Sequence, residues 1–207
     1  MNRKKGVLAV ISGFSGAGKG TVVGKLAEKY EDYVVSISAT TRAPREGEKE
    51  GVDYFYKTVE EFEEMIEKDE LIEYAKYVDN YYGTPRDYVI EQLYLGNDVI
   101  LEIEMQGALK VKERIPEVSL IFITPPNAEA LKVRLFQRGT ETEDVIAKRM
   151  ARAKEECAFM SSYDYIVVND DLDTCVEEIH SILKAAHHTK SNSKALIERI
   201  SQDFKSM

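Results

Sequence analysis

Apolar runs and amphipathic stretches alternate along most of the chain. The apolar runs rich in β-forming residues are Val7–Ser12, Tyr33–Ser38, Val99–Glu104, Leu120–Ile123 and Ile166–Val168. Stretches with helical periodicity follow them at 22–30, 108–114, 128–137, 145–158 and 172–186. Strands that alternate with helices of these lengths form parallel sheets covered by helices on both faces. The pattern therefore predicts an α/β fold of three layers.

The alternation is interrupted between Ser38 and Thr84, where short apolar pieces stand among polar residues. The stretch 39–53 is polar and contains Pro44, Gly47 and Gly51, which predicts a loop. After it come a capping box at Thr58 that begins a helix to about Lys68, a strand at Leu71–Tyr77, a turn at Asn80–Pro85 and a helix at Arg86–Leu95. We therefore expect a small mixed α+β lobe at 38–89, inserted into a core made of 1–37, 90–136 and 151–190.

The C-terminal residues differ from this domain, which we expect to end near residue 190. A polar linker at 187–193 is followed by apolar residues at helical spacing, namely Leu196, Ile197, Ile200 and Phe204. This amphipathic tail, 191–207, has three alternatives: it packs on the body, binds a partner or remains mobile.

Composition and net charge restrict the classes of protein to which this chain could belong. The 207 residues are 43% hydrophobic, and no apolar run approaches the roughly 20 residues that span a bilayer. The formal net charge of −9 argues against non-specific binding to nucleic acid or to an anionic membrane. Cys157 and Cys175 are far apart and have no partner pair for a metal, which indicates reduced thiols. Without a signal-peptide pattern, we expect a cytoplasmic protein, either a monomer or a homodimer.

The first apolar run leads into a glycine-rich turn, Gly13-Phe14-Ser15-Gly16-Ala17-Gly18-Lys19-Gly20-Thr21, and then into a helical stretch. This is the context of a phosphate-binding loop, in which backbone N–H groups and a helix N-terminus attract phosphate oxygens. A flexible turn that binds nothing is the alternative, and the flanking strand and helix disfavour it. Gly20 stands where the usual motif has Ser or Thr, and the hydroxyl comes one position later.

Two groups of arginines are candidates for further phosphate contacts. Arg42 and Arg45 lie in the polar loop, where two guanidinium forks match the geometry of a phosphate. A solvated charged loop is the alternative for this pair. A second group, Arg134, Arg138, Arg149 and Arg152, brackets the stretch 139–144. Helical arginines often only solvate a surface, but this group fits a mobile lid at 137–150.

Three carboxylates are candidates for base or metal recognition. Glu73 lies in a short strand and would by default face solvent, although a carboxylate there can accept hydrogen bonds from guanine N1–H and its amino group. Glu102 and Glu104 are two apart at the end of a predicted parallel strand, so we expect them on one face, at the edge where such sheets bind ligands. One of them could hold Mg²⁺ through water. The three histidines have no grouped acid or cysteine, which favours surface positions.

Several strings of residues together resemble the guanylate kinases, which belong to the P-loop nucleoside monophosphate kinases. They are 13–21, Ser-Ala-Thr-Thr-Arg-Ala-Pro-Arg at 38–45, Gly-Val-Asp-Tyr at 51–54, Leu-Ile-Glu at 71–73, Asn-Tyr-Tyr-Gly-Thr at 80–84, Leu-Glu-Ile-Glu-Met-Gln-Gly at 101–107, Arg-Gly-Thr-Glu-Thr at 138–142 and Val-Asn-Asp-Asp at 168–171. The resemblance runs from about residue 6 to residue 186. It implies a Mg²⁺-dependent kinase that transfers the γ-phosphoryl group of ATP to GMP or dGMP in purine metabolism, giving ADP and GDP.

The resemblance also implies a role for each matching residue. The guanine would contact Ser38, Glu73 and Thr84. It would also have Glu104 on its side, at a position where the family usually has Asp. The GMP phosphate would contact Arg42, Arg45, Tyr54 and Tyr82. ATP would be bound by 13–21, Arg134 and Asn169, and charge on the transferring group would be neutralised by Lys19, Arg42, Arg138 and Arg149. Mg²⁺ would be held by water, ATP oxygens and Glu102.

Two rival functions differ in the residues they need. The Gly-Lys-Gly-Thr form of the loop resembles adenylate kinases and suggests a kinase for AMP or another monophosphate, but Glu73 and the Arg42–Arg45 loop argue against it. A non-catalytic guanylate-kinase-like module that binds proteins would tend to lack the phosphate loop or the lid arginines. Lys19, Arg138 and Arg149 are all present, which favours the enzyme.

Overall fold

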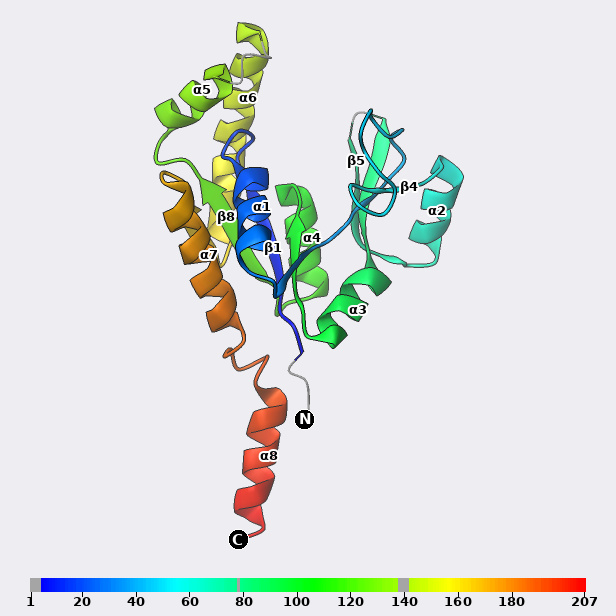
Figure 1. Ribbon diagram of the computed structural model, residues 1–207, viewed down its shortest axis with the longest axis vertical. Helices are drawn as coiled ribbons and strands as arrows, with labels where there is room; N and C mark the ends of the chain where they lie inside the picture. The colour runs from blue at the N-terminus through cyan, green and yellow to red at the C-terminus, as the bar shows by residue number, and fades with distance from the viewer. Residues whose placement is uncertain (1–4, 78, 138–141) are drawn as a thin grey trace.

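A computed structural model describes residues 5–77, 79–137 and 142–207 (Figure 1). Its larger sheet has five parallel strands in the order β2 (Tyr33–Val35), β7 (Asp98–Glu102), β1 (Leu8–Gly13), β8 (Ser119–Thr124) and β9 (Tyr165–Val168). The crossovers contain helices that flank this sheet, namely α1 (Lys19–Lys29), α3 (Arg86–Leu95), α4 (Met105–Arg114), α5 (Ala128–Gln137) and α6 (Glu143–Glu156), and α7 (Leu172–Ala186) follows the last strand. The predicted α/β fold is confirmed.

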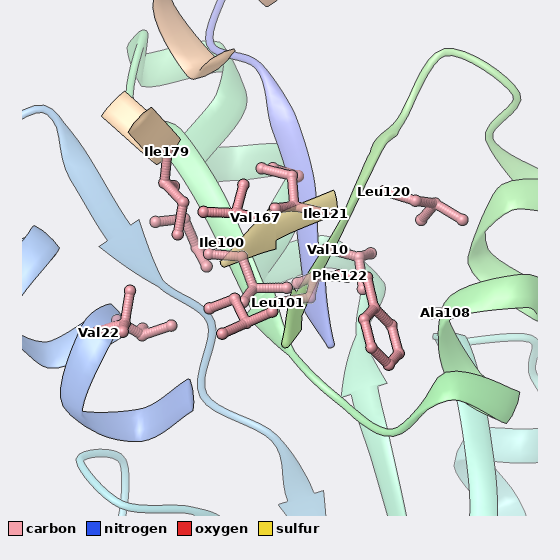
Figure 2. Packing of buried hydrophobic residues seen from close by; sticks show 14 of the residues in the cluster. Val10, Val22, Ile100, Leu101, Ala108, Leu120, Ile121, Phe122, Val167 and Ile179 are labelled. Carbon is pink, nitrogen blue, oxygen red and sulfur yellow. The ribbon is translucent and has the colours of Figure 1, made fainter. Parts of the chain in front are cut away.

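The core lies where the sheet meets its helices (Figure 2). Every residue of β1 is buried, because this central strand is covered on both faces. Side chains from the sheet pack there against residues of the helices, for example Val10, Ile100 and Phe122 of the strands and Val22, Ala108 and Ile179 of α1, α4 and α7. The end of β1 is thereby fixed in position, and the glycine-rich loop begins from that end.

A smaller sheet forms the inserted lobe, on the right in Figure 1. Its order is β4 (Phe55–Tyr56), β3 (Ala39–Thr40), β6 (Asn80–Pro85) and β5 (Leu71–Tyr77), and α2 (Val59–Glu67) begins with the predicted capping box. Its cluster of buried apolar residues contains Ala39, Phe62 and Leu71. Phe62 stacks on Tyr81 with ring centroids 5.1 Å apart. The small lobe thus has far less buried apolar surface than the main sheet. Its limits at 38 and 89 remain a prediction.

Several predicted boundaries are wrong. The stretch Asn80–Pro85, expected as a turn, is strand β6, because antiparallel pairing with β5 and β3 supplies its hydrogen bonds. The chain reverses just before it, where Asp79 has φ +67°. The first helix begins at Lys19 rather than residue 22, and α4 begins at Met105 rather than residue 108. Single-sequence patterns locate such ends poorly because local signals compete with tertiary contacts.

The strand before α4 also ends earlier than predicted. β7 stops at Glu102, and Glu104 is the N-cap residue of α4. The prediction that Glu102 and Glu104 share one face of a strand is therefore wrong. The predicted stop of α3 is confirmed, since Gly96 caps that helix at φ +92°. The helix α6 ends at Glu156 and continues as a short 3₁₀ helix, Cys157–Ser162.

The C-terminal tail forms helix α8 (Lys194–Lys205), which projects from the body in Figure 1. Its apolar residues remain largely exposed, so among the described residues it does not pack on the body. Two histidines before it are partly buried, contrary to prediction: His180 stacks on Tyr30, and His187 lies 2.9 Å from the buried carboxylate of Asp98. The two cysteines are unpaired thiols. Within the described part of the chain, no helix is long and apolar enough to cross a membrane.

Candidate active site

The glycine-rich loop has the backbone shape of a phosphate-binding loop. Gly16 and Gly18 have φ +96° and φ +90°, a region that other residues avoid, and Gly18 is the N-cap of α1. A Cβ at Gly16 would lie 2.7 Å from a methyl group of Leu135, so the loop also needs glycine for space. The ammonium of Lys19 folds across the loop and donates to Gly13 O at 2.8 Å. The loop therefore presents a helix N-terminus and a cation at the same place.

Two of the residues predicted to bind ATP, Asn169 and Arg134, form hydrogen bonds that hold the loop in place. The amide of Asn169, which follows β9, donates to Ala17 O at 2.8 Å. The Arg134 side chain of α5 donates from Nη2 to Asn169 O at 2.7 Å. Phe14 packs edge-on against Phe122 of β8, with centroids 4.9 Å apart. These contacts fix the loop between the ends of two neighbouring strands.

The helix α6 brings a further predicted arginine to the loop. Arg149 donates from Nη1 to the hydroxyl of Ser15 at 2.6 Å. Its partner in the prediction, Arg138, lies outside the described residues, as does most of the Arg-Gly-Thr-Glu-Thr string. The described half of the predicted lid therefore contacts the phosphate loop.

A cavity of about 480 Å³ opens between the two sheets. The predicted site residues that line it are Lys19, Ser38, Tyr54, Glu73, Tyr82, Glu102 and Glu104. The cavity lies beyond the carboxyl ends of the parallel strands β1 and β7, the usual ligand position in open α/β sheets. It joins the phosphate loop to the small lobe, as a site for two substrates requires.

Glu73 is the buried acid of this cavity. Only 6% of its surface is exposed, and its Oε1 accepts a hydrogen bond of 2.8 Å from the hydroxyl of Thr84. Burial raises the pKa of Glu73, while the Thr84 hydroxyl opposes the rise. A Cβ at Gly107 would lie 2.7 Å from its Oε2, so the glycine in α4 leaves space for the carboxylate. The default expectation that Glu73 faces solvent is wrong.

The loop of Arg42 and Arg45 lies on the small lobe and is its predicted phosphate-binding side. The Arg42 guanidinium lies 5.2 Å from the centroid of Tyr54, and Tyr54 contacts Tyr82 edge-on. Arg42 also forms two 3.0 Å hydrogen bonds with Glu48. The side chain of Arg45 is exposed, and its backbone N–H donates to Glu48. The structure thus brings Arg42, Tyr54 and Tyr82 together.

The carboxylates of Glu102, the last residue of β7, and Glu104, the N-cap residue of α4, have different surroundings. Partial removal from water raises the pKa of Glu102, and Lys19 opposes the rise. Glu104 lies 3.2 Å from Arg152 of α6, which also donates to Glu156 at 2.9 Å. Burial also raises the pKa of Glu156, and the hydrogen bond from Arg152 opposes this rise. Glu104 therefore faces α6 as well as the cavity.

Comparison with known proteins identifies the family and supports the fold. Residues 5–186 match the model of the family described as guanylate kinase. A guanylate kinase of Caldanaerobacter subterraneus is 51% identical over 201 residues, which cover 97% of this chain and 98% of the relative. One of Halalkalibacterium halodurans is 52% identical over 98% of both chains.

The chain belongs to the guanylate kinase family. The crystal structure of a guanylate kinase from Anaplasma phagocytophilum agrees, with a TM-score of 0.72 and 36% identity over 92% of this chain and 90% of that one. The activity of a guanylate kinase is ATP:GMP phosphotransfer, and it is the activity of this chain.

Two acids contact predicted site residues of this guanylate kinase without any expectation from the sequence. Glu48, in a stretch predicted only as a polar loop, contacts Arg42, and Glu156, in a predicted helix, contacts Arg152. An acid close after two arginines, in a loop shaped by Pro and Gly, was the available signal for Glu48. No local signal pointed to Glu156, because its burial depends on how α6 lies over the cavity.

Proposed function

We propose that this guanylate kinase transfers the γ-phosphoryl group of ATP to GMP and dGMP by positioning and charge neutralisation, without a general base. The acceptor is a phosphate oxygen that is already ionised, so no proton has to be removed first. The difficulty of the reaction is to bring two polyanions into line and to stabilise the charge between them. The single observation that carries the proposal is a cavity that joins the Lys19 loop to Glu73 of the small lobe.

On the donor side, ATP phosphates bind the N–H groups of loop 13–21. Lys19 leaves its carbonyl partner and follows the transferring group, together with Arg149 and Arg138. The Arg149–Ser15 contact supports this assignment, because it already places a guanidinium at the loop. Arg134 and Asn169 support the loop from the adenine side.

On the acceptor side, the carboxylate of Glu73 reads guanine through N1–H and the amino group. Thr84, Ser38 and Glu104 complete the base site, and Glu104 is shared with Arg152. Arg42, Arg45, Tyr54 and Tyr82 bind the GMP phosphate. Adenine lacks the donor pair that Glu73 would accept, which supports GMP over AMP.

In this proposal, Mg²⁺ binds together with ATP. Among the described residues, no group of three or more His, Cys, Asp or Glu side chains could hold a metal. A Cβ at Gly20 would lie 3.6 Å from Glu102 Oε1, so this carboxylate faces the loop where ATP phosphates would lie. One carboxylate beside phosphates is a common setting for Mg²⁺, which keeps several waters. The residues therefore fit an ion held by ATP oxygens, water and Glu102, which would neutralise phosphate charge.

A coupled ADP-release assay with ATP and Mg²⁺ tests the proposal on GMP, dGMP, AMP, UMP and CMP. We expect turnover with GMP and dGMP only. Turnover with AMP but not GMP would contradict it, and no turnover together with tight binding of a protein would favour the interaction module. The cytoplasmic location and the choice between monomer and homodimer stay predictions.

A further inference from the structure

We propose that Glu48 is a positioning residue for GMP, which holds the phosphate-binding arginine loop in its binding shape before the nucleotide arrives. The inference rests on the proposed role of Arg42 as a ligand of the GMP phosphate. Glu48 lies between β3 and β4, directly after Gly47, whose φ is +90°.

One carboxylate connects three parts of this loop. Arg42 donates from Nη1 to Oε2 and from Nη2 to Oε1, both at 3.0 Å, which is a bidentate pair. The backbone N–H of Arg45 and the hydroxyl of Tyr56 donate to Oε2, each at 2.8 Å. Glu48 thus links both arginines predicted to bind phosphate to strand β4.

The pair is largely withdrawn from water and remains charged. The side chain of Arg42 is 16% exposed and that of Glu48 is 20% exposed. Hydrogen bonds from Arg42 and from the Arg45 backbone lower the pKa of Glu48 to about 2. The carboxylate is therefore ionised at any pH at which the enzyme would be assayed.

Holding Arg42 in advance lowers the cost of binding a phosphate. A free arginine side chain samples many rotamers, and a ligand must otherwise overcome the loss of that entropy when it binds. Glu48 holds one edge of the guanidinium, and the ring of Tyr54 lies 5.2 Å from its centre. The hydrogen bonds that Arg42 donates to Glu48 and to Ala43 O use its Nη groups, and Tyr82, which is also predicted to contact the GMP phosphate, interacts with the same guanidinium.

A competing role is that Glu48 occupies the place of the phosphate and must be displaced. Displacement would also break the bonds from Arg45 and Tyr56, which do not depend on Arg42. Positioning keeps all of these bonds while the phosphate binds. The two roles predict opposite changes in affinity when the carboxylate is removed.

The test measures binding of GMP and of guanosine by calorimetry to the wild type, Glu48→Gln and Glu46→Gln. Glu46 is an exposed carboxylate of the same loop, so it controls for the loss of one negative charge near an anion site. We expect Glu48→Gln to weaken GMP binding about tenfold or more, because bonds to a charged group are lost. Guanosine binding and the KM for ATP should stay within about twofold, since neither involves this loop, and Glu46→Gln should bind GMP as the wild type does. In Glu48→Asp, which retains the charge, part of the GMP affinity should return.

Tighter binding of GMP by Glu48→Gln would overturn the inference in favour of displacement. Equal losses for GMP and guanosine would overturn it in favour of a general role in folding the lobe. Glu48→Asp supplies the same two comparisons if Glu48→Gln does not fold. A wild type that binds GMP no better than guanosine would instead refute the proposed phosphate site, whatever the variants do.

Discussion

The two halves of the active site are built in different ways. On the proposed ATP side, a glycine loop is fixed between buried parallel strands, and the donors that it would present to phosphates are mainly backbone N–H groups. On the proposed GMP side, the donors would be side chains of a small lobe whose buried apolar cluster contains Ala39, Phe62 and Leu71. The first half is held in place by burial, and the second by charged and polar contacts such as Arg42–Glu48.

This difference indicates which half can move. Burying apolar area is the main stabilising contribution in a fold, so a lobe with a small cluster opens at lower free energy than the body that carries it. A second substrate that must be enclosed is best bound by the part of the protein that opens at the lower free energy. The comparison predicts that a destabilising substitution in the small lobe impairs the binding of GMP alone. A destabilising substitution in the large core should impair the binding of both substrates.

Matched truncations of one buried phenylalanine in each half should separate the two. Phe122→Ala removes a fully buried ring from the central sheet and should lower the free energy of global unfolding by about 3–5 kcal/mol. Phe62→Ala should mainly weaken the small lobe, with a raised KM for GMP and an unchanged KM for ATP. Calorimetry, hydrogen exchange and steady-state kinetics measure these effects. If Phe62→Ala raised both KM values equally, the halves would not be independent.

The charge at the loop should matter most for chemistry. Lys19→Met removes the cation proposed to follow the transferring phosphoryl group, and should lower kcat about 100- to 1000-fold, as the loss of one transition-state donor does. The unfolding midpoint should change little, since the ammonium lies over carbonyl groups rather than in the core. Single-turnover measurement of ADP release checks this. A change confined to KM would assign Lys19 to ground-state binding.

The buried acid of the GMP half predicts a dependence on pH. Because burial raises the pKa of Glu73, the folded protein holds this proton more tightly than the unfolded chain. Its contribution to stability is thus complete below the unfolded value and is lost as pH rises through the raised value. Glu73→Gln should therefore gain stability relative to wild type between pH 4 and pH 7, while its KM for GMP rises about tenfold or more. Urea unfolding at both pH values measures the change in stability, and steady-state kinetics at pH 7 measures the change in KM for GMP. An unchanged KM for GMP would show that Glu73 does not recognise the base.

The smallest effect is expected at the irregular position of the loop. In Gly20→Ser, the new Cβ would lie 3.6 Å from the Glu102 carboxylate, an ordinary contact. We therefore expect turnover within about tenfold of wild type, roughly 1.4 kcal/mol of barrier. The rate at several Mg²⁺ concentrations is the measurement. Complete loss of activity would show that this loop binds ATP and its metal differently from the usual motif.

Patterns local in the sequence determined most of the architecture and several short motifs within it. The alternation of apolar and amphipathic stretches was sufficient to predict the parallel sheet and its helices, since burial on both faces demands apolar strands. The loop with Lys19, the capping box at Thr58 and the glycine stop at Gly96 were likewise predicted, because each depends on backbone geometry within a few residues.

Only the tertiary structure decided which side chains meet. Strand β6 exists because β5 and β3 pair with it, and Glu73 is buried because α4 offers it a glycine at Gly107. The bonds from Arg149 to Ser15 and from Asn169 to Ala17 join residues separated by more than a hundred positions. The physical reason is the range of the interactions. A turn or a cap is a contact between near neighbours, whereas a site is closed by groups that only the packing of distant elements brings within hydrogen-bond distance.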